Sequence, residues 1–341
     1  MKKMLGSWKI ILGLAISAVF MYLAFRKVKF GDMWSAFSEA NYWYVFPAIA
    51  VVFVSHWLRA LRWRYLLAPV KKIDVATLYS SLLIGYMANS FLPAHLGEFL
   101  RAYMVGKKRP VSASAVFGTI VTERIIDVFT TFLLMAVAMV LFDNFPAEVR
   151  KGGYIVFALI FVLFIVLVVM KRHPVASYKI IDKLTSPLPE GVRSKISRLF
   201  RSFMEGIVPL AHRKDYLFVF LLSIVIWACY AFIFQLLFYA FDFVAKYSLP
   251  WSASLVLLVI TTFSVLIPSS PGYVGTYHYL CVFTLRLFSK PVPESEALSY
   301  AFVAHGINFL PLLIVGLILI SVAGMSVKSL QQQAKIQDEE Y

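Results

Sequence analysis

Apolar residues gather into long runs along the chain, separated by short polar segments. At about 20 apolar residues per crossing of a bilayer, most of these runs are long enough to span a membrane as helices. The pattern therefore predicts an all-α polytopic membrane protein. The runs cover about 10–25, 44–61, 78–92, 115–141, 153–170, 216–241, 251–267, 272–287 and 297–324.

Two of these regions are interrupted by proline and glycine at a depth where a spanning helix would still lie in the membrane. The run 78–92 leads into NSFLPAHLGEF, and the run 251–267 leads into LIPSSPGYVGTYHY. Lipid offers no hydrogen bonds to a broken backbone, so such a break must be covered by protein or must line a wet cavity. We therefore predict re-entrant helical hairpins over 78–103 and 251–287.

The distribution of basic residues predicts the orientation. The chain has 33 Lys and Arg against 18 Asp and Glu. With two re-entrant hairpins, the segments on one side carry 24 Lys and Arg and those on the other side carry 7. Because basic residues collect on the cytoplasmic side, we expect about six full transmembrane helices, a multi-pass topology and both termini in the cytoplasm.

The two breaks also share a spacing, which predicts an inverted repeat. Pro93-x-x-x-Gly97 in the first hairpin matches Pro268-x-x-x-Gly272 in the second. A span, a hairpin and a span recur at about 44–141 and 216–324, and the two copies enter their hairpins from opposite sides. Inverted repeats with broken helices are typical of secondary transporters. Chance recurrence of the short motif is the alternative.

The domain organisation follows from the same pattern. Residues 1–325 form one integral membrane domain, and 326–341 form a polar tail. The segment 171–215 joins the two repeat halves. It contains a basic amphipathic helix with Ile196, Leu199, Phe200 and Phe203 on one face, which either lies on the cytoplasmic leaflet or is a solvated linker helix.

Composition excludes several classes of protein. The chain is 60% hydrophobic and only 15% charged, whereas soluble domains have about 25% charged residues. A soluble enzyme is therefore excluded. The formal net charge of +15 fits cytoplasmic loops facing an anionic inner leaflet, so we expect no nucleic-acid partner. We find no nucleotide-binding or nucleophile motif.

The strongest chemical signal is a group of ionisable residues inside the run 115–141. Glu123 and Asp127 lie four residues apart on one helical face, and Arg124 lies three residues before Asp127. A charge at mid-bilayer costs about 2.5–3.5 kcal/mol, so these three residues need partners. They either form part of a binding site or lock this helix to its neighbours as a structural ion cluster.

Polar residues and helix-breaking residues surround both breaks. A helix that starts after a break presents free N–H groups, which favour an anion; the alternative is that the small residues only permit close packing. The predicted cavity residues are Asn89, His95, Glu98, Arg101, Glu123, Arg124, Asp127, Ser269, Ser270, Tyr273, Tyr277, His278 and His305. The predicted break positions are Pro93, Gly97, Pro268, Pro271, Gly272 and Gly275.

Two further groups of polar residues allow a functional or a structural role. Arg59 and Arg62 share a face at the inner end of the second span and fit a site and an interfacial anchor equally well, whereas Trp63 and Arg64 favour an anchor. His305 is either a site member or a satisfied core histidine. The histidines show no metal-ligand spacing along one helix, so we predict no metal and no cofactor.

The motifs together resemble the lysylphosphatidylglycerol synthase transmembrane, or flippase-like, family over about 10–325. The resemblance rests on NSFLPAHLGEFLRAYMVGKK, TIVTERIIDV, IPSSPGYVGTYHY and a late proline at 311. It implies an inner-membrane protein in which two re-entrant helices frame a cavity for a lipid head group. The positions that match the family motifs are Pro93, Gly97, Glu98, Arg101, Glu123, Arg124, Asp127, Pro271, Gly272 and Gly275.

The chain also departs from this family. It has His278 where many members have Glu, and His305 where many have Arg. The best-known members are fused to a soluble aminoacyl-transferase domain, which these residues do not contain, so we expect no lysyl transfer.

The functional expectation is a lipid flippase or transporter-like protein of a bacterial or archaeal plasma membrane that moves a phosphate-bearing lipid between leaflets. The expected partners are a membrane phospholipid or a polyprenyl-phosphate-type lipid and the anionic inner leaflet; homo-oligomers are left open. We expect that the protein is not an enzyme, because the sequence contains no catalytic motif. The alternatives are a membrane-embedded enzyme acting on lipid phosphates and a non-transporting scaffold of a lipid-synthesis complex.

Overall fold

The computed structural model describes residues 2–90, 96–141, 147–206, 210, 212–265, 267 and 269–322, and the described part is helical without strands. Three helical segments are long and apolar enough to cross a membrane: Tyr42–Leu67, Arg213–Ala240 and Glu294–Val322. They correspond to η1 (Tyr42–Tyr44) with α3 (Val45–Leu67), to α10 (Arg213–Ala240) and to α14 (Glu294–Val322). The prediction of an all-α membrane protein is confirmed.

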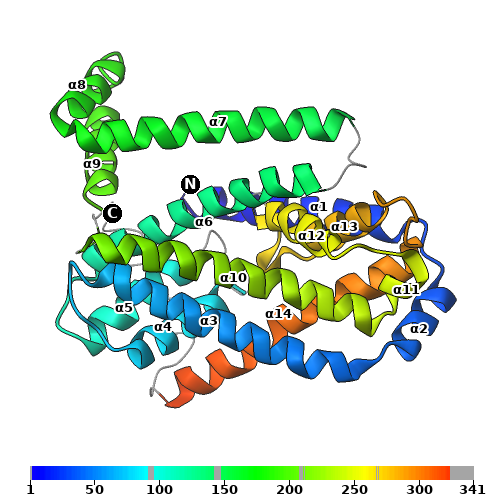
Figure 1. The fold of residues 1–341 in the computed structure, drawn as a ribbon. Coiled ribbons are helices and arrows are strands. Elements are labelled where there is room, and N and C mark those ends of the chain that lie inside the picture. Colours follow the sequence, from blue (N-terminus) through cyan, green and yellow to red (C-terminus); the bar gives the residue numbers. More distant parts are fainter. Residues whose placement is uncertain are drawn as a thin grey trace.

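Three more helices have the length of a membrane span. These are α1 (Lys2–Phe25), α6 (Ala113–Leu141) and α7 (Ala147–Arg172), with 24, 29 and 26 residues. In Figure 1, α3 and α10 run side by side, and α14 crosses them obliquely. The predicted tail, 326–341, lies outside the described residues.

Four helices are much shorter and form two pairs. The first pair is α4 (Val75–Asn89) with α5 (Leu96–Lys108), and the second is α12 (Ser252–Thr262) with α13 (Thr276–Leu285). At 1.5 Å per residue they are roughly 15–22 Å long, against about 30 Å for the hydrocarbon core. Figure 1 shows the first pair toward one end of the long helices and the second pair toward the other.

Close backbone packing joins the helices of the first pair. Gly85 of α4 faces Gly97 of α5, and a Cβ atom at Gly97 would collide with the carbonyl oxygen of Gly85 and the side chain of Asn89. The amide of Gly97 donates a hydrogen bond to Asn89 Oδ1 at 2.8 Å. Gly97 lies inside α5 and permits the two short helices to touch, which is the close-packing alternative for the small residues near the breaks.

The last long helix, α14, contacts both short pairs. Gly316 packs against Met87 of α4, where a Cβ atom would have no room. Nearer its start, α14 packs along α13. Pro311 lies inside this helix, between the two contact regions.

The apolar core is centred on α10, α12, α13 and α14. Tyr300 stacks on Phe238 and Phe243, and its hydroxyl donates to the carbonyl of Phe234 at 3.1 Å. A second cluster between α3, α5 and α6 contains the fully buried Trp63 and Ile120. The two clusters hold the short pairs against the long helices.

Smaller helices complete the chain at its polar segments. The bounds are α2 (Phe30–Glu39), α8 (Pro174–Leu184), α9 (Glu190–Gly206), α11 (Phe243–Tyr247), η3 (Phe263–Val265) and η4 (Pro271–Tyr273). The predicted amphipathic helix in 171–215 is α9, which packs against α6 and α8. Its location on the leaflet stays a prediction.

Candidate functional site

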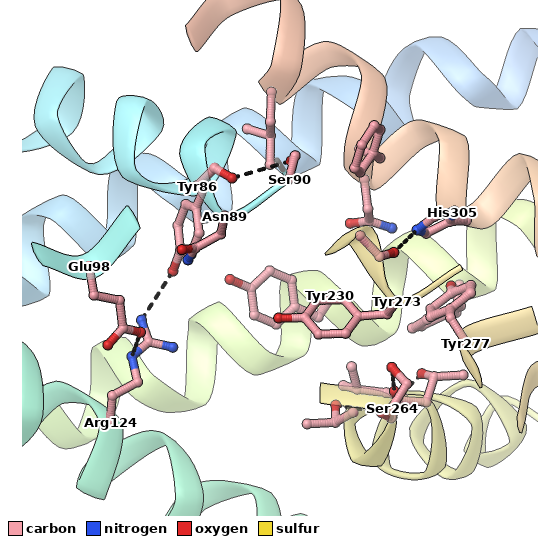
Figure 2. A pocket seen from close by; sticks show the side chains of 18 residues that line it. Tyr86, Asn89, Ser90, Glu98, Arg124, Tyr230, Ser264, Tyr273, Tyr277 and His305 are labelled. Atoms are coloured by element: carbon pink, nitrogen blue, oxygen red, sulfur yellow. Dashed lines mark hydrogen bonds and ion pairs between the residues drawn. The ribbon is translucent and has the colours of Figure 1, made fainter. Parts of the chain in front are cut away.

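A cavity of about 330 Å³ lies between the two short helix pairs. Residues from α4, α5 and α6 line one side, and residues from α10, α12, α13 and α14 line the other (Figure 2). The lining residues are Tyr86, Asn89, Ser90, Glu98, Arg124, Tyr230, Phe234, Leu258, Thr261, Thr262, Ser264, Gly272, Tyr273, Tyr277, His305, Asn308, Phe309 and Leu312.

The structure brings seven of the residues singled out from the sequence to this cavity. They come from stretches more than 200 positions apart in the chain, so only the fold brings them together. These residues are Asn89, Glu98, Arg124, Gly272, Tyr273, Tyr277 and His305.

Arg124 is the one arginine or lysine among the described residues that line the cavity. Its side chain is 36% exposed, and its Nε lies 3.0 Å from Glu98 Oε1. Its Nη2 donates to the hydroxyl of Tyr86 at 3.5 Å, as Figure 2 shows. Arg124 therefore connects α6 to α5 and α4, and together with Glu98 it forms the charged wall of the cavity.

Behind Arg124 lies a buried cluster of charges. Glu123 Oε1 is 2.9 Å from Arg59 Nη1, and its Oε2 is 2.7 Å from Arg101 Nη2. Asp127 is 2.9 Å from Arg59 and 2.7 Å from Arg62. Such burial is tolerated only where each charge has close partners of opposite sign. The cluster ties α3, α5 and α6 together.

The predicted ion pair between Arg124 and Asp127 is present, but it is the longest of the three ion pairs that Asp127 makes with described residues. Arg124 Nη1 lies 3.7 Å from Asp127 Oδ2, whereas the two arginines of α3 approach more closely. The structure therefore places Arg59 and Arg62 in the ion cluster, where the side chain of Arg62 is fully buried.

Trp63 is not an interfacial anchor, contrary to the interpretation favoured from the sequence. The residue is fully buried, and its indole N–H donates to Thr119 Oγ1 at 2.9 Å. The guanidinium of Arg101 lies over its ring at 3.5 Å, which is within the range of cation–π attraction. Arg101 is therefore held between Trp63 and Glu123, and it does not line the cavity.

The charges of this region do not cancel. Four guanidinium groups, from Arg59, Arg62, Arg101 and Arg124, face three carboxylates, from Glu98, Glu123 and Asp127. With all seven groups ionised, the net charge is +1. Arg124 and Glu98 both line the cavity and offset each other, so the excess positive charge belongs to the buried part of the cluster directly behind Arg124.

The second break forms the opposite wall without ionic groups. Gly272, Tyr273 and Gly275 have φ values of 76°, 58° and 92°, in the left-handed region that glycine adopts most readily. His305 Nε2 is 2.8 Å from the carbonyl oxygen of Gly272, which it meets as a hydrogen-bond donor (Figure 2). This hydrogen bond ties the break to α14 and fixes the proton on Nε2.

Ser269, Ser270 and His278 lie beside the cavity but do not line it. The amide of Ser270 donates to Ser17 Oγ of α1 at 2.8 Å, and Thr276 Oγ1 donates to Ser269 Oγ at 3.3 Å. His278 is buried, with its ring centroid 5.0 Å from that of His305. These residues therefore support the backbone of the second break on the side that faces away from the cavity.

Three sequence-predicted residues, Pro93, His95 and Pro268, lie outside the described residues. Pro271 begins η4 and is exposed. Within the described ranges no group of three or more histidines, cysteines and carboxylates is placed to hold a metal ion.

Sequence reasoning missed two tyrosines of the cavity. Tyr86 lies three residues before Asn89 on the same helix, so helical spacing could have found it. Tyr230 accepts a hydrogen bond from Arg59 Nε at 2.6 Å, but it lies on α10 and no local pattern distinguishes it from other aromatic residues of that helix.

Comparisons with known proteins place this geometry in a family. Over 115 residues the chain is 33% identical to a "UPF0104 membrane protein" of Methanothermobacter thermautotrophicus, which covers 33% of each chain. It is 28% identical over 133 residues to "Glycosyltransferase AglD" of Haloferax volcanii, which covers 38% of this chain and 21% of that protein. The matches thus span about a third and a fifth of these relatives.

A family match covers most of the chain. Residues 10–316, which include both short helix pairs and the ion cluster, match the family described as "Lysylphosphatidylglycerol synthase TM region". The resemblance seen in the motifs is confirmed, and the chain belongs to the lysylphosphatidylglycerol synthase TM region family.

Proposed function

We propose that this protein is a lipid flippase or transporter-like protein that moves a phosphate-bearing lipid between leaflets. The observation that carries the proposal is the excess of one positive charge in the ion cluster, which lies directly behind the cavity residue Arg124. A singly charged phosphodiester placed at Arg124 neutralises the cluster. Charges interact strongly away from bulk water, so this match favours an anionic head group.

The short helix pairs support the predicted re-entrant hairpins and inverted repeat. Each of their helices is too short to cross the bilayer, and the pairs lie toward opposite ends of the long helices (Figure 1). Two hairpins that enter from opposite sides meet near the middle of the membrane. In transporters built from inverted repeats, the substrate site lies at this position.

Glu98 and a phosphate compete for the same guanidinium in this mechanism. Arg124 Nε is held by Glu98 at 3.0 Å, and a planar guanidinium binds phosphate oxygens with two parallel hydrogen bonds. A phosphate head group therefore takes the place of Glu98 at Arg124 while Glu98 remains in the cavity, so the count of charges is unchanged. Asn89 and Tyr273 offer neutral polar contacts. Acyl chains remain in lipid while the head group passes between the hairpins.

The relatives support lipid or glycolipid handling as the wider role. The family takes its name from a lipid synthase, and one relative is named a glycosyltransferase. A membrane-embedded enzyme acting on lipid phosphates, or a scaffold of a lipid-synthesis complex, is the alternative to transport. Both alternatives use the same cavity differently, so the decisive experiment must measure movement and chemistry together.

The test is translocation of a fluorescent phospholipid in proteoliposomes that contain the purified protein. Arg124→Gln removes the cation at the cavity and should cut the translocation rate at least several-fold. Arg109→Gln is the matched control, because this exposed arginine pairs with Asp74 away from the cavity. Lipids are extracted afterwards and analysed by mass spectrometry.

Transport is supported if wild type and Arg109→Gln move intact lipid and Arg124→Gln does not. Translocation that is equal in wild type and Arg124→Gln overturns the proposal. Chemically altered lipid made by pure protein supports the enzyme. Activity that requires a co-purified protein supports the scaffold.

A further inference from the structure

A second, larger cavity lies on a different face of α6 from the one that carries Arg124 and the first cavity. Its volume is about 790 Å³, and α6, α7 and α10 line it. This volume is within the range of about 300–1,000 Å³ typical of ligand pockets. Its walls are mainly apolar, with Phe129, Leu133 and Ile224 among the lining residues. We call it the α6–α7 groove.

One end of this groove is basic. Lys171 and Arg172, the last residues of α7, line it, and no carboxylate does so among the described residues. Tyr216 lines the same cavity from the first turn of α10, two residues after the exposed Lys214. The buried Asp215 between them accepts a hydrogen bond from the amide of His212 at 3.1 Å and does not line the cavity. Figure 1 shows the end of α7 and the start of α10 at the end of the molecule that carries α8 and α9.

We propose that the α6–α7 groove binds an anionic membrane phospholipid from the leaflet on the α8 and α9 side. The acyl chains lie along the apolar wall of α6 and α10, and the phosphate is held by Lys171 and Arg172. Lys171 Nζ donates one hydrogen bond to the carbonyl of Met204, which leaves two N–H groups of the ammonium for a ligand. The predicted orientation makes this the cytoplasmic leaflet.

An apolar cavity that ends in cations fits a lipid better than it fits a soluble ligand. Lipid tails require an apolar wall open to the bilayer, and Ile224 and Phe220 on that wall are half exposed. Basic residues at the membrane surface attract anionic lipids by about 1 kcal/mol each. Charge complementarity therefore selects an anionic head group over a zwitterionic one.

The groove also adjoins the ion cluster without sharing its charges. Ser223 lines the groove, and its hydroxyl accepts a hydrogen bond from Arg62 Nη1 at 2.9 Å. The cluster is therefore separated from the groove by one side chain of α10. This site is distinct from the transport cavity, and its test does not depend on transport.

The experiment measures phosphatidylglycerol and phosphatidylcholine retained by the purified protein after detergent exchange from mixed vesicles. The double variant Lys171→Gln, Arg172→Gln should retain roughly thirtyfold less phosphatidylglycerol, as expected from the loss of two cations near a lipid surface. Retention of phosphatidylcholine should not change. Lys179→Gln, Lys183→Gln on α8 is the control with the same change of charge at exposed positions.

A second variant tests the apolar wall. Ile224→Trp fills the groove from an exposed position, so it should lower retention of phosphatidylglycerol without lowering the melting temperature. Ile318→Trp, at an exposed position of α14 away from the groove, is its control. Arg124→Gln is measured alongside, and adding Lys171→Gln and Arg172→Gln to that variant should still lower its retention of phosphatidylglycerol, because the groove does not include Arg124.

Wild-type retention of phosphatidylglycerol by the double variant overturns the proposal. Equal loss of both lipids also overturns it, because the head group is then not selected. A loss found only in Arg124→Gln assigns the lipid to the transport cavity instead.

Discussion

The two short helix pairs frame one cavity, but they contribute different chemistry to it. The pair α4 and α5 supplies Glu98 and Arg101, and Arg101 joins the ion cluster through Glu123. The pair α12 and α13 contains no Asp, Glu, Lys or Arg between Ser252 and Leu285. It contributes hydroxyl groups, aromatic rings and a backbone in an uncommon conformation. Charge thus comes from one pair and shape from the other.

Glycine differs between the pairs in the same way. Gly97 is helical and is needed because Gly85 and Asn89 leave no room for a side chain. Gly275 also lacks room, because a Cβ atom would meet the backbone of Ser17 on α1, and it has in addition a φ of 92°. The first pair needs glycine for contact alone, whereas the second pair needs it for contact and for backbone conformation.

Removal of the central carboxylate of the ion cluster, on the charged side of this comparison, should lower the stability of the protein more than the other changes below. Glu123→Ala leaves Arg59 and Arg101 without their shared partner, and breaking one side of a buried ion pair costs about 3–5 kcal/mol. Yield and melting temperature in detergent should fall sharply. Glu98→Ala is the control, because Glu98 is partly exposed and should change the melting temperature much less. Equal effects of the two changes would contradict a buried cluster.

Substitution of Gly97 and of Gly275 by alanine should destabilise the protein to different degrees. Overpacking costs about 1–3 kcal/mol, and an uncommon backbone conformation forced on alanine adds about 1–3 kcal/mol. Gly275→Ala should therefore lower the melting temperature more than Gly97→Ala does. Gly31→Ala is the control, because nothing lies within 4 Å of the added methyl group. The reverse order of the two would show that contact, and not conformation, dominates at the second break.

The smallest effect concerns how each pair begins. Asp74 caps α4 by accepting a hydrogen bond from the amide of Thr77 at 2.7 Å, whereas α12 begins at Trp251 without a side-chain cap. Asp74→Ala should cost about 1 kcal/mol, measured by thermal melting at neutral pH. Asp74→Asn keeps the capping oxygen and should lose less.

Asp74 also gives the first pair a dependence on pH. The hydrogen bond from Thr77 and the neighbouring Arg109 lower the pKa of Asp74 from 3.8 to about 2. Because the pKa of Asp74 is lower in the folded protein than in the unfolded chain, the ionised carboxylate stabilises the fold at any pH above the unfolded pKa. This stabilisation is lost as the pH falls from about 4 toward 2. The melting difference between wild type and Asp74→Asn should therefore disappear over that range. A constant difference would exclude the carboxylate charge as its cause.

The sequence predicted the short pairs and part of the site because their signals are local. Proline and glycine in apolar runs predict breaks in a helix. Three ionisable residues within five positions of an apolar run predict a buried ion cluster or a binding site. Arg59 and Arg62 stayed undecided because their partners lie on α6, more than 60 positions away. The position of Arg101 just after the break predicts a cavity residue, but its stacking on Trp63 is visible only in the fold.

Pro311 gives α14 a further consequence for the whole molecule. This one helix meets the first pair at Gly316 and the second break at His305, and Asn308, Phe309 and Leu312 line the cavity between them. Proline removes the hydrogen bond that would reach the carbonyl of Ile307, so bending there is less costly than elsewhere along the helix. Because α14 contacts one short pair on each side of Pro311, a bend at the proline would change the distance between the two pairs and with it the width of the cavity.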